Sequence, residues 1–294
     1  MSNCRLNIEI SSNINVNTIF YKEYNYVMVG EIHVLEDIAL AIEDGVVIYI
    51  RNGVFEEATI KRSALIFDTG SKLISSDFYL VACNSKNEPE TLADNGGLWF
   101  VGSRSDVDKD GIKAKYSSKS SNFSSNKIYA YYLGSTDPEH WIYEPSADQD
   151  AITVLGCGNN EWNITSVYIE MSGDNAFDIF ESYITMDEVE VMYPGEDAIN
   201  IQSGQINVIK KLKCIVPLTN VYDRDIFDFE NDYAFPYIRI AQYAFVELLG
   251  IFGDQTSMVS SDLPQPNGDK LYYFSGICTN GQTYIWAGFR KPDV

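Results

Sequence analysis

Segments in which apolar and polar residues alternate recur along this chain at similar intervals. Four related segments begin at residues 149, 174, 196 and 224, so that the intervals between them are 25, 22 and 28 residues. Alternation with a period of two is typical of a half-buried β-strand. A recurrence of about 20 to 30 residues built on short strands predicts stacked coils. The four segments are 149–154, 174–179, 196–201 and 224–229.

The four segments also predict which side chains face the core of the stack. Side chains of a strand point alternately to its two faces, so one face of each segment is expected to be buried. We expect a buried column of Ala151, Ala176, Ala198 and Ile226, with the apolar residues that follow packed beside it. The polar residues between those apolar positions are expected to face solvent; they are Thr153, Asp178, Asn200 and Asp228.

A second pair of repeats lies upstream of these segments. Residues 39–48 align with residues 65–74 when Gly45 is matched to Gly70. Each unit is interpreted as a strand, a turn and a strand, because glycine suits a turn that needs a positive φ. Further strands are expected at 26–29, 32–35, 79–81, 98–101, 164–171 and 186–192.

The repeats divide the chain into three parts of an all-β protein. Residues 1–25 are expected to form an N-terminal cap or strand, residues 26–232 the stacked coils, and residues 233–294 a small β module for capping or docking. Within this module, 271–274 and 284–289 are expected to form a hairpin. Residues 84–127 are polar and irregular, which predicts long loop insertions in the coils.

Charge and cysteine content narrow the classes of partner. The chain has 42 Asp and Glu against 21 Lys and Arg, a formal net charge of −21. This disfavours binding to nucleic acid or anionic lipid, and it is compatible with binding cations or neutral glycans. The five scattered cysteines indicate free thiols. The sequence begins without a signal-like apolar run and has no long apolar stretch, so cytoplasmic synthesis without membrane insertion is expected.

One segment links the chain to a known superfamily. Residues 195–204, Gly-Glu-Asp-Ala-Ile-Asn-Ile-Gln-Ser-Gly, are similar to the Gly-Asp-Asp-x-Ile-x-Ile-x-Ser-Gly motif of pectin-degrading glycoside hydrolases. The upstream units resemble the β-helices of bacterial surface proteins and phage tail or fibre proteins. Over about residues 30–230 the chain thus resembles the right-handed parallel β-helix (pectate-lyase-like) superfamily. The resemblance implies a right-handed parallel β-helix, a solenoid with long loop insertions and a small C-terminal β-rich module.

The resemblance also implies where a catalytic carboxylate triad would lie. Its positions fall on Asn175, Glu196 and Asp197, so one carboxylate is replaced by an amide. The histidine and the Arg-x-Lys segment of those hydrolases have no counterpart here. Glycoside hydrolysis needs two carboxyl groups, and neighbouring coils offer candidates. The catalytic candidates are Asp174, Glu196, Asp197 and Asp225, and the alternative is that these residues only form turns between strands.

Residues 106–111 have the Asp-x-Asp-x-Asp-Gly spacing of a calcium loop. Alternate carboxylates from Asp106, Asp108 and Asp110 could converge on one hard cation, while Gly111 permits a sharp turn. Ser117 stands where such a loop has its bidentate glutamate. Calcium is therefore the one candidate cofactor, and the alternative is a solvated loop without metal.

Aromatic residues are dense in two places on either side of residue 135. Tyr131 and Tyr132, together with Trp141 and Tyr143, are candidates for stacking on sugar rings. The alternative is ordinary strand packing, because aromatic residues favour strands.

These observations favour a non-enzymatic β-helix that is a structural or glycan-recognising part of a larger assembly. We expect a bacteriophage virion component, such as a fibre, spike or capsid-associated protein, that contacts other structural proteins or itself, for example as a trimer, and host glycans. Two alternatives stay open: a polysaccharide hydrolase or lyase using the acidic residues above, and a bacterial cell-surface or extracellular adhesin. Catalysis itself is left undecided by the sequence.

Overall fold

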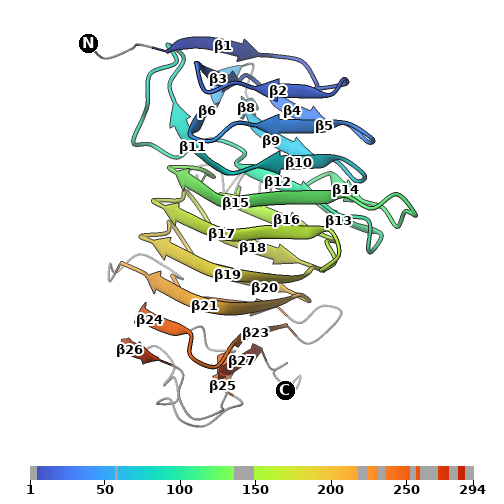
Figure 1. The fold of residues 1–294 in the computed structure, drawn as a ribbon. Coiled ribbons are helices and arrows are strands. Elements are labelled where there is room, and N and C mark those ends of the chain that lie inside the picture. The colour runs from blue at the N-terminus through green and yellow to red at the C-terminus, as the bar shows by residue number, and fades with distance from the viewer. Residues whose placement is uncertain are drawn as a thin grey trace.

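The protein is an all-β structure built from long parallel sheets (Figure 1). The computed structural model describes residues 5–56, 59–135, 149–217, 224–230, 236–251, 256–258, 271–277 and 284–288. Every regular element among these residues is a strand, which confirms the all-β prediction. In this part of the chain no helix is long and apolar enough to cross a membrane.

The first of three parallel ladders runs the length of the molecule within a 16-stranded sheet. Its strands pair in register in the order in which the chain reaches them. They are β1 (Leu6–Ile10), β3 (Tyr24–Met28), β6 (Val46–Arg51), β11 (Asp77–Cys83), the second halves of β15 (Asn122–Tyr131), β17 (Trp162–Glu170), β19 (Tyr183–Met192) and β21 (Gln205–Ile215), and then β24 (Phe245–Gly250).

The second ladder is a separate 7-stranded sheet. Its strands are short and also parallel. They are β4 (Glu31–Val34), β9 (Ala64–Phe67), β12 (Leu98–Val101), β16 (Ile152–Leu155), β18 (Phe177–Phe180), β20 (Ile199–Gln202) and β22 (Phe227–Glu230).

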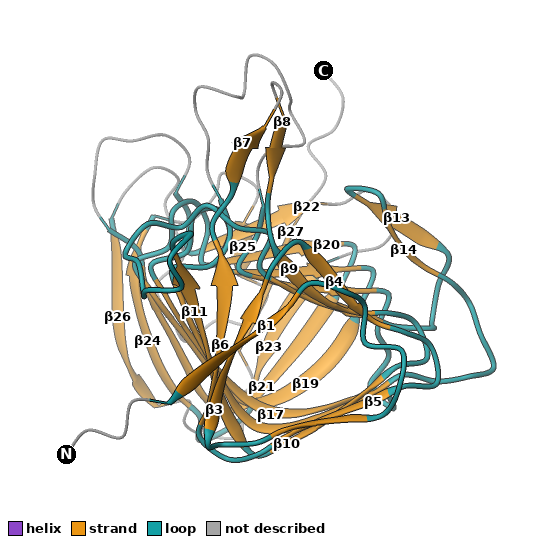
Figure 2. Cartoon of the chain, turned by 90° about the horizontal axis from the view of Figure 1, so that it is seen from above, coloured by secondary structure: helices purple, strands orange, loops and turns teal. Residues whose placement is uncertain are grey.

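The third ladder belongs to the same sheet as the first. It consists of β2 (Thr18–Phe20), β5 (Ala39–Ile42), β10 (Lys72–Ser75), the first halves of β15, β17, β19 and β21, and then β23 (Tyr237–Ile240). Between β17 and β19 the register pairs cover only the second halves of the two strands. In the later coils, one long strand thus contributes its first half to the third ladder and its second half to the first ladder. Each turn of the chain adds one strand to each ladder, and the view along the stack shows the three walls around a common interior (Figure 2). This pairing is compatible with the expected β-helix.

Antiparallel strands occur at the C-terminal end and in two excursions from the coils. β26 (Tyr272–Ile277) pairs with β24, while β27 (Tyr284–Gly288) pairs with β23 and with β25 (Thr256–Met258). The predicted hairpin between the last two segments is therefore wrong, because each lies on a different ladder. The excursions are the hairpins β7 (Val54–Glu56) with β8 (Thr59–Lys61), and β13 (Val107–Lys109) with β14 (Ile112–Ala114).

The four repeated segments stack as predicted. Ile152, Phe177, Ile199 and Phe227 are register partners in the second ladder, and all four are fully buried. The column of Ala151, Ala176, Ala198 and Ile226 is buried as well. The expectation for the polar column is wrong: Thr153, Asp178 and Asn200 are buried on the outer side of this sheet.

Two further predictions from the sequence need correction: the alignment of the upstream repeats and the end of the loop insertion. β5 pairs with β10 and not with β9, so the upstream repeats are offset by one strand from the alignment through Gly45 and Gly70. Both glycines have positive φ, but they lie at different corners of the coil. The insertion after β12 ends before residue 122, because residues 122–127 already belong to β15. A strand rich in Ser and Asn has the composition of a loop.

Three glycines let successive coils approach closely at one corner. A Cβ at Gly195 would collide with the carbonyl oxygen of Gly173, and a Cβ at Gly173 would collide with backbone atoms of Gly134 and Ser135. Backbone cannot move aside as a flexible side chain can, so this corner excludes larger residues.

Replacing Gly195 with alanine is expected to lower the free energy of unfolding by about 3 kcal/mol, because the added methyl overpacks rigid backbone. Gly45→Ala is the matched control, since Gly45 has φ +75° and no atom within 4 Å of the added Cβ. It should cost only the backbone strain of about 1 kcal/mol. Urea unfolding of both variants gives the comparison. Equal losses would contradict the close approach of the coils.

Candidate binding groove

A groove of about 710 Å³ lies where the strands of the first ladder end and the chain turns toward the second. One wall is the segment Thr91–Ala93 of the loop between β11 and β12. The floor comes from corner residues of three successive coils, Tyr132, Met171 and Tyr193. Arg224 and Pro217 close the end toward the C-terminal coils.

The three corner residues occupy equivalent positions in their coils. Each has φ +58°, a left-handed conformation that is uncommon for residues other than glycine. Each also donates its backbone N–H to a carbonyl of the next coil: Tyr132 to Glu170 at 3.0 Å, Met171 to Met192 at 2.9 Å and Tyr193 to Ile215 at 2.8 Å. The side chains of Met171 and Tyr193 are 40% and 44% exposed. The coil spacing of about 4.8 Å therefore sets out a row of apolar side chains along the groove.

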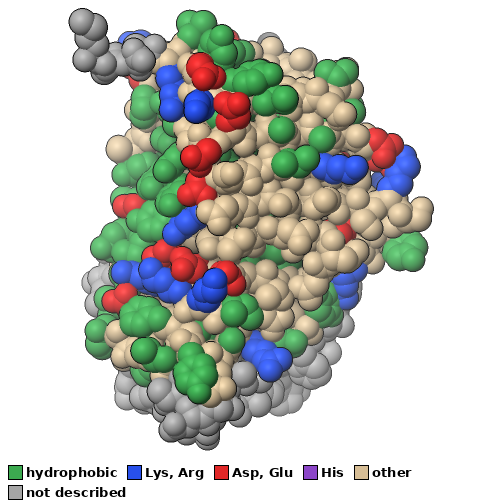
Figure 3. All heavy atoms as spheres, in the orientation of Figure 1, with side chains coloured by type: hydrophobic (Ala, Val, Ile, Leu, Met, Phe, Trp, Pro, Cys, Tyr) green, Lys and Arg blue, Asp and Glu red, His purple; other side chains and the backbone are tan. Residues whose placement is uncertain are grey.

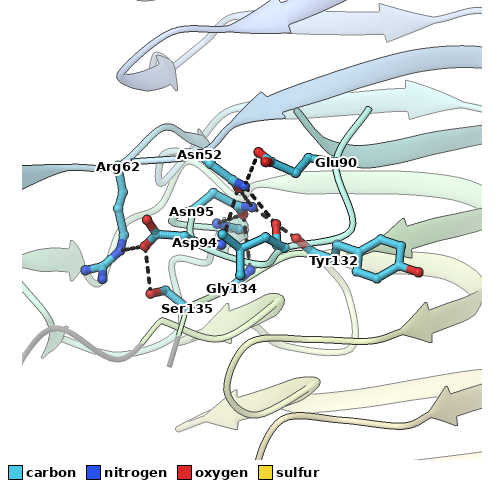
Figure 4. A network of polar contacts seen from close by, with 10 residues as sticks. Asn52, Arg62, Glu90, Asp94, Asn95, Tyr132, Gly134 and Ser135 are labelled. Carbon is cyan, nitrogen blue, oxygen red and sulfur yellow. Dashed lines mark hydrogen bonds and ion pairs between the residues drawn. The ribbon is translucent and has the colours of Figure 1, made fainter. Parts of the chain in front are cut away.

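A buried polar network fixes the backbone beneath the groove (Figure 4). The Asn95 amide is fully buried and uses both of its ends. Its Nδ2 donates to Asn52 Oδ1 at 3.0 Å and to the Tyr132 carbonyl at 3.1 Å, while its Oδ1 accepts from the N–H groups of Gly97 at 3.2 Å and Gly134 at 3.1 Å. One side chain thus ties together three passages of the chain.

The same network attaches the loop wall to the coils. Asn52 donates to the Leu92 carbonyl at 2.7 Å. Asp94 Oδ1 accepts from Arg62 Nε at 3.0 Å and from Ser135 Oγ at 3.1 Å. Figure 4 shows the ring of Tyr132 pointing away from this network. The network therefore holds the backbone of Tyr132, while Tyr132 also lines the groove. The wall and the floor are thereby positioned before any ligand binds.

The structure separates the two neighbouring tyrosines proposed for sugar stacking. Tyr132 lines the groove, whereas Tyr131 lies in β15 on the outer face of the first ladder, with its ring 5.8 Å from that of Tyr168. Tyr79 and Tyr129 on that face are stacked, with centroids 4.7 Å apart. Figure 3 shows apolar side chains along this edge of the sheet. Sugar stacking by Tyr131 stays a prediction. Trp141 and Tyr143 lie outside the described residues.

The catalytic candidates hold successive coils together. Asn175 Oδ1 accepts the N–H of Asp197 at 3.1 Å, and Asp197 Oδ1 accepts the N–H of Asp225 at 2.7 Å. Asp174 and Asp197 are only 6% and 7% exposed. Burial, with Asp228 and Glu196 nearby, raises the pKa of Asp197 well above its usual value. The neighbours Gly195 and Arg224 line the groove, but Asp197 is not among the lining residues.

The calcium-like sequence folds as a β-hairpin. Asp110 and Gly111 form its turn with φ +51° and +82°. Asp108 Oδ1 accepts the N–H of Gly111 at 3.2 Å, and its Oδ2 lies 2.9 Å from Lys113 Nζ. Asp106 Oδ1 accepts the N–H of Tyr116 at 2.7 Å. Among the described residues no group of three or more His, Cys, Asp or Glu could hold a metal ion. Binding of calcium by Asp106, Asp108 and Asp110 stays a prediction.

Sequence reasoning missed two features of this region. The groove residues share a pattern of Tyr or Met, any residue, then Gly, which occurs at 132–134, 171–173 and 193–195 and could have been found. The hairpin was interpreted through its acidic residues, whereas one of its two lysines, Lys109, contacts Asp150 and Asp178 on the outer side of the second ladder. No local sequence pattern predicts that contact, because Asp150 and Asp178 are 41 and 69 residues away from Lys109 in the chain.

Comparison of the chain with protein-family models, with curated proteins and with solved structures finds no match. The functional assignment therefore rests on the geometry of the groove.

Replacing Asn95 with alanine is expected to lower the free energy of unfolding by about 3 kcal/mol, because buried backbone N–H groups would lose their hydrogen-bond acceptor. Amide hydrogen exchange should rise mainly in residues 84–97 and around Tyr132. Asn163→Ala serves as the control, since Asn163 is exposed and donates one hydrogen bond of 3.3 Å to Asn122. If exchange in the loop is unchanged in Asn95→Ala, the network does not hold the groove wall.

Proposed function

We propose that this chain is a right-handed parallel β-helix that binds a neutral glycan in the groove and performs no catalysis on it. The in-register stacking of successive turns on three ladders supports the β-helix. The row of Tyr132, Met171 and Tyr193 is the observation that supports glycan binding.

The row suits a sugar chain for two physical reasons. Tyrosine offers a large, rigid contact surface with a polar tip, which matches a sugar ring with apolar and hydroxylated parts. Tyr193 is 44% exposed and Tyr132 is half-buried, so both rings are partly accessible to a ligand. Because the row follows the stacking direction of the coils, it favours an extended ligand over a compact one.

The charge of the molecule favours a neutral ligand. A formal net charge of −21 repels polyanions at long range, and polyuronides are polyanions. The groove is lined by one acidic and one basic residue, Glu170 and Arg224. A carboxylate can accept hydrogen bonds from sugar hydroxyls, and a guanidinium can donate hydrogen bonds to them.

We further propose that the chain is part of a larger assembly, with a bacteriophage particle as the expected setting and a bacterial cell surface as the alternative. Support comes from the N-terminal end of the stack, where β1 is an edge strand of its sheet. Apolar side chains are exposed there, Leu6 at 68%, Val16 at 65% and Ile19 at 48%. An open apolar edge is suited to pairing with another structural protein or a second copy of this chain.

Tyr193→Ala is expected to weaken binding of a neutral oligosaccharide about tenfold, which corresponds to the loss of one stacking contact of about 1.4 kcal/mol. Tyr243→Ala is the matched control: Tyr243 also has a positive φ, +69°, and is 72% exposed, but it does not line the groove. A neutral-glycan array identifies the ligand, and calorimetry measures both variants. Equal affinities of the two variants would refute the groove as the binding site.

A hydrolase remains the second candidate, because the raised pKa of Asp197 is a property that a general acid needs. We expect no release of reducing sugar from neutral polysaccharides or polyuronides by the unaltered protein. Asp197→Asn should stay folded, since an amide oxygen already accepts the equivalent bond at Asn175. Activity that is present in the unaltered protein and lost in Asp197→Asn would replace the binding proposal with the hydrolase.

A further inference from the structure

The hairpin β13–β14 brings an amine against two carboxyl groups on the outer side of the second ladder. Lys109 Nζ lies 2.7 Å from Asp150 Oδ2 and 2.8 Å from Asp178 Oδ2. The three side chains are 16%, 3% and 0% exposed. This is a buried cluster of one potential nucleophile, one potential electrophile and one potential proton carrier.

The two carboxyl groups of the cluster are surrounded by buried side chains. Trp99 and Thr153 are the register neighbours that precede Asp178 in the ladder, and both are buried. The hairpin covers this face through an apolar cluster in which Val107 and Ile112 pack against it. Thr153 Oγ1 donates to Asp150 Oδ2 at 3.1 Å, which fixes the carboxyl group beside the amine.

The cluster is costly as a set of charges. Asp178 Oδ1 is buried without a hydrogen-bond partner among the described residues. An ionised carboxylate in that position loses its hydration and recovers only part of it from Lys109. Joining the amine to the carboxyl group in a neutral amide would remove two buried charges at once.

Burial and mutual contact shift the pKa values of the two groups that would react, Asp178 and Lys109. Burial raises the pKa of Asp178 above its usual value, against the opposing effect of Lys109, and so favours the neutral acid. Burial alone would lower the pKa of Lys109, but Asp150 and Asp178 outweigh it and raise the pKa. The amine must therefore pass its proton to a carboxylate before it can attack, and Asp150 is in hydrogen-bond contact to take it.

We propose that Lys109 and Asp178 become joined by an intramolecular amide bond, with Asp150 as the proton carrier. Lys109 Nζ gives a proton to Asp150, and the neutral amine attacks Cγ of the protonated Asp178. A bond from Nζ to Cγ forms, the bond from Cγ to one carboxyl oxygen breaks, and that oxygen leaves as water. The remaining proton stays on Asp150 or passes to solvent. No oxidant or co-reactant is required.

The contact between Lys109 and Asp178 makes this condensation feasible in a protein that is dissolved in water. Groups held in contact react with effective concentrations far above those in solution, and the buried site resists the reverse hydrolysis. The bond would tie β13 to β18 and close the intervening chain into a loop. The hairpin, and with it the cover of the second ladder, would then stay attached even when the coils loosen.

Mass spectrometry of the intact, denatured protein tests the proposal. The unaltered chain, kept folded at neutral pH, should be lighter than its sequence by one water molecule. Peptide mapping should join the segment that contains Lys109 to the segment that contains Asp178. Full sequence mass and separate peptides from the folded protein would overturn the proposal and leave an ordinary buried ion pair.

Two variants assign the roles. Lys109→Arg retains the positive charge but should have the full mass of its sequence. Asp150→Asn should form the bond at least tenfold more slowly, because an amide is a poor proton carrier. Circular dichroism checks that each variant is folded. Linkage of Asp150→Asn at the unaltered rate would overturn the role of Asp150, and a lost water in Lys109→Arg would place the linkage elsewhere.

Discussion

The structure depends on the in-register parallel pairing of each coil with the next. Because the three ladders share one interior, the inward-facing residues of a repeat must match their counterparts in side-chain direction. The pairing of Ile152, Phe177, Ile199 and Phe227 fixes the register of the second ladder, and the glycine corner at Gly173 and Gly195 fixes how closely the coils approach. The same register places Tyr132, Met171 and Tyr193 in a row. A binding surface therefore follows from the constraint that builds the core.

The sequence predicted the repeating part of this fold because its period is local. Residues 196–201 and their copies show their strand pattern and spacing without knowledge of distant contacts. The upstream alignment through Gly45 failed for a related reason: glycine marks a turn but does not say which of three corners it occupies. The C-terminal strands were placed near their true positions, while their partners depend on ladders that a local pattern does not reveal.

The candidate site was less predictable than the fold. Tyr132 was named from aromatic density, but its neighbour Tyr131 has the same composition signal and lies on another surface. Asp178 was expected to face solvent because strand alternation describes two faces and cannot tell that a hairpin covers the outer one. Burial of Asp178 and its contact with Lys109 come from segments far apart in the chain, so only the folded arrangement brings this chemistry together.

Because the coil register places the groove residues in a row, the ligand is expected to follow the stacking direction of the coils. A crystal structure of the protein with a bound neutral oligosaccharide tests this most directly. We expect sugar rings on Tyr132 and Tyr193, with the glycan crossing Met171 along the row. An oligosaccharide bound instead on the outer face at Tyr79 and Tyr129, or across the coils away from the row, would contradict binding in the groove.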